Sequence, residues 1–220
     1  MEKVYTSVLS VLFISLLTLG TAFAASSSST VATGVDLMQT TPGEPEIILS
    51  NVIHTSSQKD LAVDVSLECG LYTRTLVKSK AGTKDTSVAD ASVKVRVLVD
   101  GVEAYPGTVT FCSRAQELSA TFGGIFENCE DTDGDGHITL DECDLTDEEL
   151  ELILTTVNAN AFNFILDDVG VGDHLIEVEA TADWGSSYQT GDAEAKAFVG
   201  KGSMTVEEIR LIKDEDKIEM

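Results

Sequence analysis

Basic residues are scarce in this chain. It has 14 Lys+Arg against 38 Asp+Glu among 220 residues, which gives a formal net charge of −24 at pH 7. A surface this negative repels nucleic acids and anionic membranes, and it attracts divalent cations. Acidity does not imply disorder here, because 43% of the residues are apolar and many of them alternate regularly. We therefore expect a folded acidic protein that has no nucleic-acid partner.

Signatures of catalysis are also lacking. The 3 histidines are His54, His137 and His174, and none of them falls in a nucleophile motif or a metal triad. Asp167 and Asp168 form an acidic pair, but adjacent residues on a strand point to opposite faces, so they do not suit a glycosidase. The prediction is that the protein is not an enzyme.

Long hydrophobic runs are missing except near the N-terminus. There the apolar run from Val8 to Leu19 follows Lys3 and precedes the small-residue signature Ala22-Phe23-Ala24. This order is typical of a signal peptide cleaved after Ala24, since a bilayer span needs roughly 20 apolar residues. An uncleaved anchor is the alternative. We expect a secreted protein, placed outside the cell or in the cell-envelope space, without a stable membrane span after cleavage.

The remaining chain divides into a linker and a β-rich body. Residues 25–45 are rich in Ser, Thr and Pro without apolar periodicity, which predicts a flexible linker. From residue 46 onward, apolar residues alternate with polar ones, as in Leu61–Leu71 and Val93–Val99. Asp100-Gly101 is a hairpin signal, and Gly200-Lys201-Gly202 predicts a turn before a last strand. The expected fold is an antiparallel β-sandwich of about eight strands over residues 46–220. At the level of pattern it resembles Ig-like or jelly-roll sandwiches.

One acidic segment, Asp131 to Glu142, matches D-x-[DN]-x-[DN]-G-x5-E at every fixed position. Calcium takes six to eight oxygens, and carboxylates at alternate loop positions supply them while Gly136 permits the sharp turn. The segment resembles the calcium loop of the EF-hand family. The predicted Ca²⁺ ligands are the side chains of Asp131, Asp133, Asp135, Thr139 and Glu142 and the backbone carbonyl of His137.

The 4 cysteines are candidates for two disulfides in an exported protein. Four cysteines allow three pairings. Cys129 and Cys143 bracket the calcium loop, whose two ends converge on one ion, so we favour Cys129–Cys143 together with Cys69–Cys112. The cysteines and histidines lack the C-x2-C and H-x3-H spacing of zinc sites.

The surroundings of the loop depart from the EF-hand pattern. Thr146 and Glu149 form a capping box, and the apolar residues that follow predict a short helix from about Asp147 to Thr156. The preceding Gly123-Gly124 pair is poor helix material, so we expect loop and helix to be inserted between strands at about residues 127–158. Without a second such loop, Ile138 is expected to pack against the sandwich, or else against Ile138 of another molecule.

These observations predict a secreted calcium-binding protein whose sandwich serves extracellular binding or assembly. A calcium-dependent module for carbohydrates or surfaces is one alternative, although stacking aromatics are scarce. Its candidate platforms are Trp184, Tyr188, Tyr105 and Tyr72, and Trp184 shares its strand parity with core residues. A self-assembling filament or coat subunit is another, in which the leader before Pro45 inserts into a neighbour. The expected partners are the calcium ion and an extracellular glycan or protein.

Overall fold

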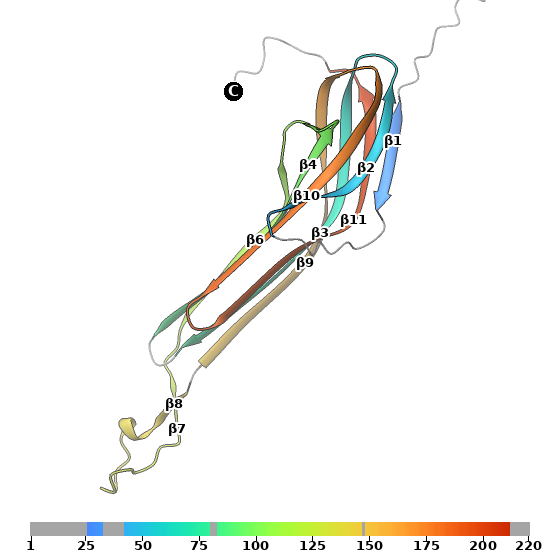
Figure 1. Cartoon of the computed structure of the whole chain (residues 1–220). Coiled ribbons are helices and arrows are strands. Elements are labelled where there is room, and N and C mark those ends of the chain that lie inside the picture. Colours follow the sequence, from blue (N-terminus) through green and yellow to red (C-terminus); the bar gives the residue numbers. More distant parts are fainter. Residues whose placement is uncertain (1–25, 33–41, 80–82, 147, 212–220) are drawn as a thin grey trace, which may run out of the picture.

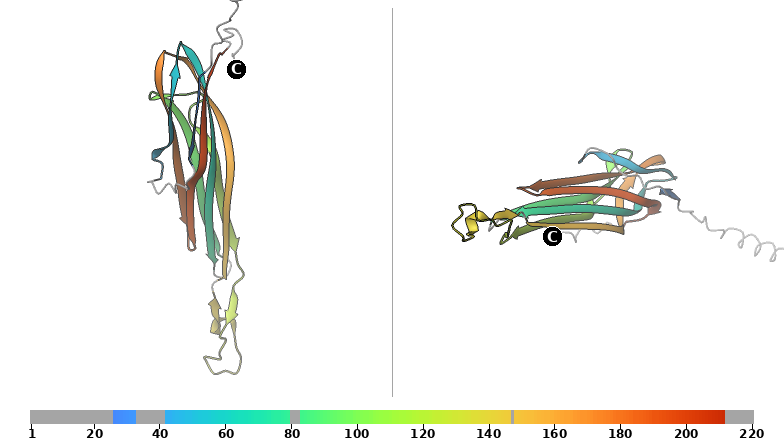
Figure 2. Two further views of the ribbon diagram at one scale, coloured as in Figure 1. Left: turned by 90° about the vertical axis from the view of Figure 1, so that its right-hand side faces the viewer. Right: turned by 90° about the horizontal axis from the view of Figure 1, so that it is seen from below.

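The computed structural model describes residues 26–32, 42–79, 83–146 and 148–211, so the predicted signal segment 1–24 lies outside the described residues. These ranges form two packed antiparallel sheets drawn out along one axis, with a small third sheet at one end (Figures 1 and 2). The described part contains no α-helix and one short 3-10 helix. It therefore has no helix that is long and apolar enough to cross a membrane. The predicted β-sandwich is confirmed.

The first sheet has the strand order β1 (Ser27–Ala32), β11 (Asp192–Ile209), β3 (Lys59–Ser79) and β9 (Glu148–Val169). The second has the order β2 (Pro45–Thr55), β10 (Gly172–Tyr188), β4 (Lys84–Val99) and β5 (Val102–Glu103), and β6 (Val109–Thr121) also pairs with β4. The third pairs β7 (Ile125–Glu127) with β8 (Asp144–Thr146), and a short 3-10 helix, η1, spans Leu140–Glu142. The described residues thus form eleven strands, where the sequence predicted about eight, because short edge strands carry little periodicity.

The period-2 patterns become strands with one buried face. Along β4, every second residue from Asp85 to Val99 is buried, and the intervening residues are exposed or half-buried. The predicted hairpin follows β4, since Asp100 and Gly101 have φ values of 51° and 80°, as a type I′ turn requires. Trp184 is half-buried against the apolar core, as its strand parity predicted.

The core changes in character along the sandwich. In the half that contains β1 and β2, it consists of large apolar side chains such as Leu61, Phe164 and Met204. In the other half, here called the arm (residues 69–79, 84–92, 113–121, 148–158 and 183–199), alanines and polar residues take most of the buried positions, beside Leu71 and Val77. There Gln116 is 6% exposed; its Oε1 accepts a hydrogen bond from Thr73 (2.8 Å), and its Nε2 donates to Thr75 (2.7 Å).

Side-chain links join the two sheets where β6 faces β9. The Cys69–Cys112 disulfide connects β3 to β6, as predicted. Asn160 of β9 donates to the Phe111 carbonyl (2.8 Å), and Arg114 of β6 donates to the Leu154 carbonyl (3.0 Å). This edge of the sandwich is therefore fixed by covalent and polar contacts as well as by apolar burial.

The predicted helix from Asp147 to Thr156 is wrong, because residues 148–156 lie in β9. Leu150, Leu152 and Leu154 alternate at strand period and pair with Val77, Thr75 and Thr73 of β3. The capping-box residues serve other contacts: the Thr146 hydroxyl donates to the Ile125 carbonyl (3.1 Å), and Glu149 forms an ion pair with Lys78 (2.6 Å). Pairing along β3 outweighs the local helix signal.

Two further expectations need correction. Residues 27–32, placed in the predicted linker, form β1 and pair antiparallel with β11 from Gly202 to Glu207. An edge strand is held by backbone hydrogen bonds, so it needs no apolar periodicity.

The Gly200-Lys201-Gly202 segment is a bulge inside β11, not a turn between two strands. A Cβ at Gly202 would lie 2.2 Å from the Leu67 side chain, so a larger residue there would require that buried side chain to move.

A buried carboxylate ties together the turns at the end of the arm. Asp85 is 2% exposed, and its oxygens accept hydrogen bonds from the backbone N–H groups of Lys78 (2.7 Å), Thr86 (2.9 Å) and Thr190 (3.2 Å). Burial raises the pKa of Asp85, but the hydrogen bonds outweigh that effect and leave its pKa below the ordinary value. The charged carboxylate therefore links the β3–β4 turn to the β10–β11 turn.

Replacing Asp85 with alanine is expected to lower the free energy of unfolding by about 2–4 kcal/mol, because the buried N–H groups lose their charged acceptor. Urea denaturation measures the loss. Asp90→Ala, an exposed position on the same strand, is the matched control and should change stability by less than about 0.5 kcal/mol. Equal losses in the two variants would contradict the role of Asp85.

Candidate functional site

The predicted calcium loop lies at the far end of the arm, in a segment that we call the tip (residues 122–146; Figures 1 and 2). The tip leaves β6, forms the β7–β8 ladder and returns to β9, so the loop is inserted between strands. At the base of the loop, the Cys129–Cys143 disulfide holds the two Cα atoms 4.0 Å apart, as predicted. The Glu130 N–H donates to the Glu142 carbonyl (3.3 Å). The two loop ends are therefore fixed next to each other.

Asp131 organises the first half of the loop. Its carboxylate accepts hydrogen bonds from the backbone N–H groups of Gly134 (2.6 Å), Asp135 (3.2 Å) and Gly136 (2.8 Å). Gly134 and Gly136 have φ values of +74° and +84°, in the left-handed region that glycine adopts without strain. The bond from Gly136 is the largest cause that holds the pKa of Asp131 below its ordinary value.

Glu142 closes the loop from the other side. One carboxylate oxygen accepts from the Thr132 N–H (2.8 Å) and hydroxyl (2.9 Å), and the other accepts from the Thr139 N–H (2.9 Å) and hydroxyl (3.2 Å). These hydrogen bonds lower the pKa of Glu142 to about 2, and the bond from the Thr139 backbone N–H has the largest effect. The carboxylate is therefore ionised throughout the physiological pH range.

The loop brings three predicted ligands together. Asp131, Asp133 and Glu142 each offer a carboxylate oxygen, and these oxygens lie within 4.8 Å of one another. Asp135 is adjacent but outside this group, and its carboxylate accepts from the His137 N–H (2.7 Å). The Thr139 hydroxyl reaches the group only by donating to Glu142. The donor set consists of hard oxygens, which suit Ca²⁺ or Mg²⁺ better than a soft metal.

Ile138 does not pack against the sandwich, so that prediction is wrong. Its side chain is 59% exposed at the tip, beyond the ends of the arm strands. The exposed apolar residues of the tip are Ile125, Phe126, Ile138 and Leu140. The sequence alone favoured packing on the sandwich because the chain has no second calcium loop with which Ile138 could pair, but the inserted segment extends away from the core.

A second cluster lies at the opposite end of the sandwich. His174 Nδ1 is 2.7 Å from an Asp100 carboxylate oxygen, and His174 Nε2 is 3.1 Å from both the Thr55 hydroxyl and the Gly170 carbonyl. The order hydroxyl, imidazole, carboxylate resembles a nucleophile relay. However, Thr55 is completely buried and its hydroxyl donates to the Gly170 carbonyl, so the hydroxyl is engaged inside the protein. The cluster joins the β4–β5 turn to β10 and β2.

Comparison with known proteins gives little guidance. No family model matches this chain, and no curated protein matches it. Two solved structures are similar over most of its length. The "Structure of infectious bursal disease virus Gx strain" is 14% identical, covers 87% of this chain and 33% of its own, and has a TM-score of 0.31. The "Structure of infectious bursal disease virus Gt strain" is 13% identical, and the similarity covers 88% of this chain and 44% of that one, with a TM-score of 0.16. The chain spans about a third of the first of these proteins.

The His174–Asp100 pair is expected to make stability depend on pH. The hydrogen bond between His174 and Asp100 raises the pKa of His174 above its ordinary value, although burial acts in the opposite direction. Because this pKa is higher in the folded than in the unfolded state, protonated His174 stabilises the fold fully below about pH 6.5. This contribution is lost as pH rises through the folded-state pKa. The unfolding free energy of the native chain minus that of His174→Gln should therefore be larger at about pH 5.5 than at about pH 8.5.

Asp100→Asn provides the control, since asparagine also tolerates the left-handed backbone at this position. In that background, the larger effect of His174→Gln at about pH 5.5 should shrink, because the main group that raises the pKa of His174 is gone, whereas burial, the Gly170 carbonyl and Asp173 still act on it. A pH dependence as large as that of the native chain would contradict this assignment.

Proposed function

We propose that this chain is a secreted calcium-ion-binding protein, in which an EF-hand-type loop at the tip of the sandwich binds Ca²⁺ for extracellular binding or assembly. The observation that carries the proposal is the convergence of Asp131, Asp133 and Glu142 oxygens within 4.8 Å. Oxygens on opposite sides of a calcium ion, each at about 2.4 Å, are separated by about that distance. Separations within 4.8 Å are therefore compatible with three oxygens that share one ion.

The remaining donors complete a calcium sphere in this proposal. Asp135, Thr139 and the His137 carbonyl lie in the same loop and are the further donors in this proposal. Hydrogen bonds already hold Asp131 and Glu142 in the ionised form, so metal binding does not compete with protons near neutral pH. The cost is that Ca²⁺ must displace some hydrogen bonds that Thr132 and Thr139 donate to Glu142.

The disulfide at the base of the loop supports binding. Cys129 and Cys143 are separated by 14 positions. A disulfide that closes a loop of this size lowers the conformational entropy of the unfolded chain, which corresponds to a free energy of about 3 kcal/mol at 25 °C. The metal-free loop is thus already restricted, and less ordering remains to be done when the ion binds. Two disulfides and a β fold are compatible with an extracellular protein.

Calcium is expected to order the tip more than to stabilise the whole sandwich. No tip residue belongs to the buried apolar core, and the β7–β8 ladder is separate from both large sheets. Such a segment opens locally at a lower free energy than global unfolding requires. In this proposal the ion fixes a surface that presents Ile125, Phe126, Ile138 and Leu140 to a partner.

Assembly through the N-terminal strand is a second candidate. Strand β1 lies on the edge of the first sheet and contacts β11 through an antiparallel ladder over six residues. A subunit that donated this strand to a neighbour would exchange that ladder without loss of hydrogen bonds. Sizing the mature chain with and without residues 25–45 tests this candidate, because only a strand-exchanged assembly would dissociate on truncation.

Calorimetric titration of the oxidised mature chain with Ca²⁺ is expected to show one site, with a dissociation constant of roughly 10⁻⁴–10⁻³ M, as in other extracellular calcium modules. Asp131→Ala and Glu142→Ala should weaken binding by at least about tenfold, since each removes a charged ligand. Amide hydrogen exchange should slow in residues 125–146 when calcium is added and change little in β3 and β4.

Asp141→Asn is the matched control, because Asp141 is an exposed carboxylate within the loop but outside the ligand positions. It should retain calcium binding within about threefold. If Asp141→Asn and Glu142→Ala weaken binding equally, the loop acts as a general acidic surface and the proposal is wrong.

The apolar tip residues are expected to drive calcium-dependent association. Without the ion, the acidic loops of two tips repel each other, and bound Ca²⁺ neutralises part of that charge. Sedimentation velocity should show self-association only with calcium, and the double variant Ile138→Ser/Leu140→Ser should abolish it. Val171→Ser is the control, because Val171 is 69% exposed at the other end of the sandwich. Association unaffected by the double variant would exclude the tip as the contact.

A further inference from the structure

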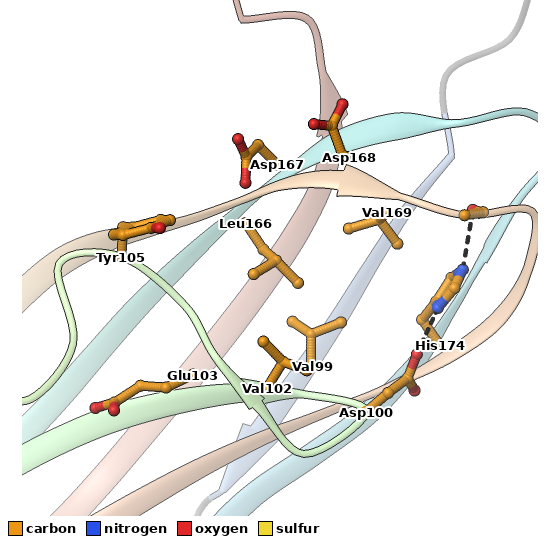
Figure 3. Close-up of a pocket in the computed structure, with 11 residues that line it drawn as sticks. Val99, Asp100, Val102, Glu103, Tyr105, Leu166, Asp167, Asp168, Val169 and His174 are labelled. Atoms are coloured by element: carbon orange, nitrogen blue, oxygen red, sulfur yellow. Dashed lines mark hydrogen bonds and ion pairs between the residues drawn. The ribbon is translucent and has the colours of Figure 1, made fainter.

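One edge of β9 is open along the arm. The strand pairs with β3 on one side, and among the described residues no strand runs along its other side (Figure 1). At Ile165 this second side is covered, because the N–H and carbonyl of Ile165 exchange hydrogen bonds with the Tyr105 backbone (2.9 and 2.8 Å; Figure 3). The tip joins the opposite end of β9. The open edge therefore extends from Glu149 to Asn163, over about 50 Å.

The contacts of Ile165 show which backbone groups lie on the open edge. In an antiparallel ladder, the N–H and carbonyl of one residue face the same neighbouring strand, and successive residues alternate. The register between β3 and β9 is regular from Glu148 to Leu166, so the odd-numbered residues of β9 face away from β3, as Ile165 does. The β6 side chains that reach β9 donate to the carbonyls of Leu152 and Leu154, which belong to the even-numbered set. These contacts do not use the backbone groups on the open edge.

Apolar side chains beside the open edge are incompletely covered. Leu150 and Leu152 are 45% and 39% exposed, although their partners on β3, Val77 and Thr75, are completely buried. Residues that are directly opposite each other in a ladder lie on the same face of the sheet. The loss of burial from β3 to β9 therefore comes from the open side of β9. A further strand beyond β9 would cover these leucines.

The open edge also lacks the usual protection against pairing. Edge strands commonly carry Lys or Pro, which keep other strands away. Residues 152–166 contain no charged residue and no Pro, in a chain that has 38 Asp+Glu. Nearer the tip, Glu149 forms an ion pair with Lys78 (2.6 Å), and Glu151 forms one with Arg74 (2.5 Å). The edge is therefore suited to a strand that brings no charge of its own to the middle of the ladder.

We propose that the open edge of β9 binds an extended segment of another protein, which adds to the first sheet as an antiparallel strand. Backbone hydrogen bonds to the odd-numbered residues hold the segment, and its alternate side chains cover Leu152 on one face of the sheet and Ile153 on the other. The segment has β-branched or apolar residues in its middle and no acidic residue. A net charge of −24 disfavours both an acidic partner and a second copy of this chain. The proposal does not rest on the calcium loop.

The probe is the peptide acetyl-Lys-Thr-Val-Thr-Val-Thr-Val-Thr-Lys-amide, titrated into the mature chain to about 1 mM and followed by NMR. It should shift the backbone resonances of residues 149–163. Hydrogen exchange should slow more at the odd-numbered amides of this segment, because the even-numbered ones already bond to β3. The same peptide methylated at two adjacent central nitrogens keeps its charge and side chains but cannot pair, so it should bind at least about tenfold more weakly. Equal binding of the two peptides would show attraction by charge alone and overturn the proposal.

Thr155→Pro removes one N–H from the open edge, and proline is tolerated on an edge strand when its nitrogen faces solvent. This variant should bind the probe at least about tenfold more weakly. Thr155→Val, which keeps the N–H at the same exposed position, is the matched control and should bind as the native chain does. Thermal unfolding checks the fold, since Thr155→Pro should lower the melting temperature less than Thr156→Pro, whose N–H faces β3. Unchanged binding by Thr155→Pro would overturn the proposal.

Two further results would assign the edge to a different partner. A calcium-independent dimer of the native chain that Thr155→Pro dissociates would show that a second copy occupies the edge, and would overturn the proposal. Equal binding of a peptide with glutamate in place of both lysines would overturn the exclusion of acidic partners. Asp131→Ala should bind the probe normally, so failure of the calcium site and failure of this proposal are distinguishable.

Discussion

Strand β3 is the element on which the rest of the structure depends. It spans 21 residues and pairs with β11 on one side and β9 on the other along nearly all of that length. One continuous backbone ladder therefore connects the apolar body to the arm. The register of β3 also decides which face of β9 and β11 is buried, because a slip by one residue would turn every side chain to the opposite face.

The composition of the core follows from this long ladder. Near β1 and β2, large side chains fill the space between the sheets, whereas in the arm Ala89, Ala91 and Ala195 occupy equivalent buried positions. Alanine contributes less apolar burial per position than leucine or valine does. Hydrogen bonds through Gln116 and Asp85 and the Cys69–Cys112 disulfide compensate for part of that loss.

The sequence predicted those strands, turns and side-chain groupings that depend on residues near one another in the chain. The alternation in β3 and β4, the Asp100-Gly101 turn and the convergence of Asp131, Asp133 and Glu142 each depend on residues close in sequence. The first half of β9 carried apolar residues that fit both helix and strand periods. Only its pairing with β3, about 75 positions away in sequence, decides between them.

Exposure and distant contacts were beyond such patterns. Isoleucine is usually a core residue, but Ile138 is exposed. Nothing in the loop sequence indicates that this segment extends past the sandwich. A cleft lined by Tyr105, Leu166 and His174 is assembled from the segment between β5 and β6, from β9 and from β10. Tyr105 was a candidate platform because it is one of few aromatic residues, but the sheet topology decides which residues share the cleft with it.

The route of the chain through the tip has a mechanical consequence. The tip is joined to β6 of the second sheet and to β9 of the first, so a partner that pulled on it would load both sheets together. Because these strands run along the axis of the molecule (Figure 1), the load would act parallel to the β4–β6 and β3–β9 ladders. In that direction many hydrogen bonds must break at once and not one after another. The tip is thus attached in the geometry that best resists extension.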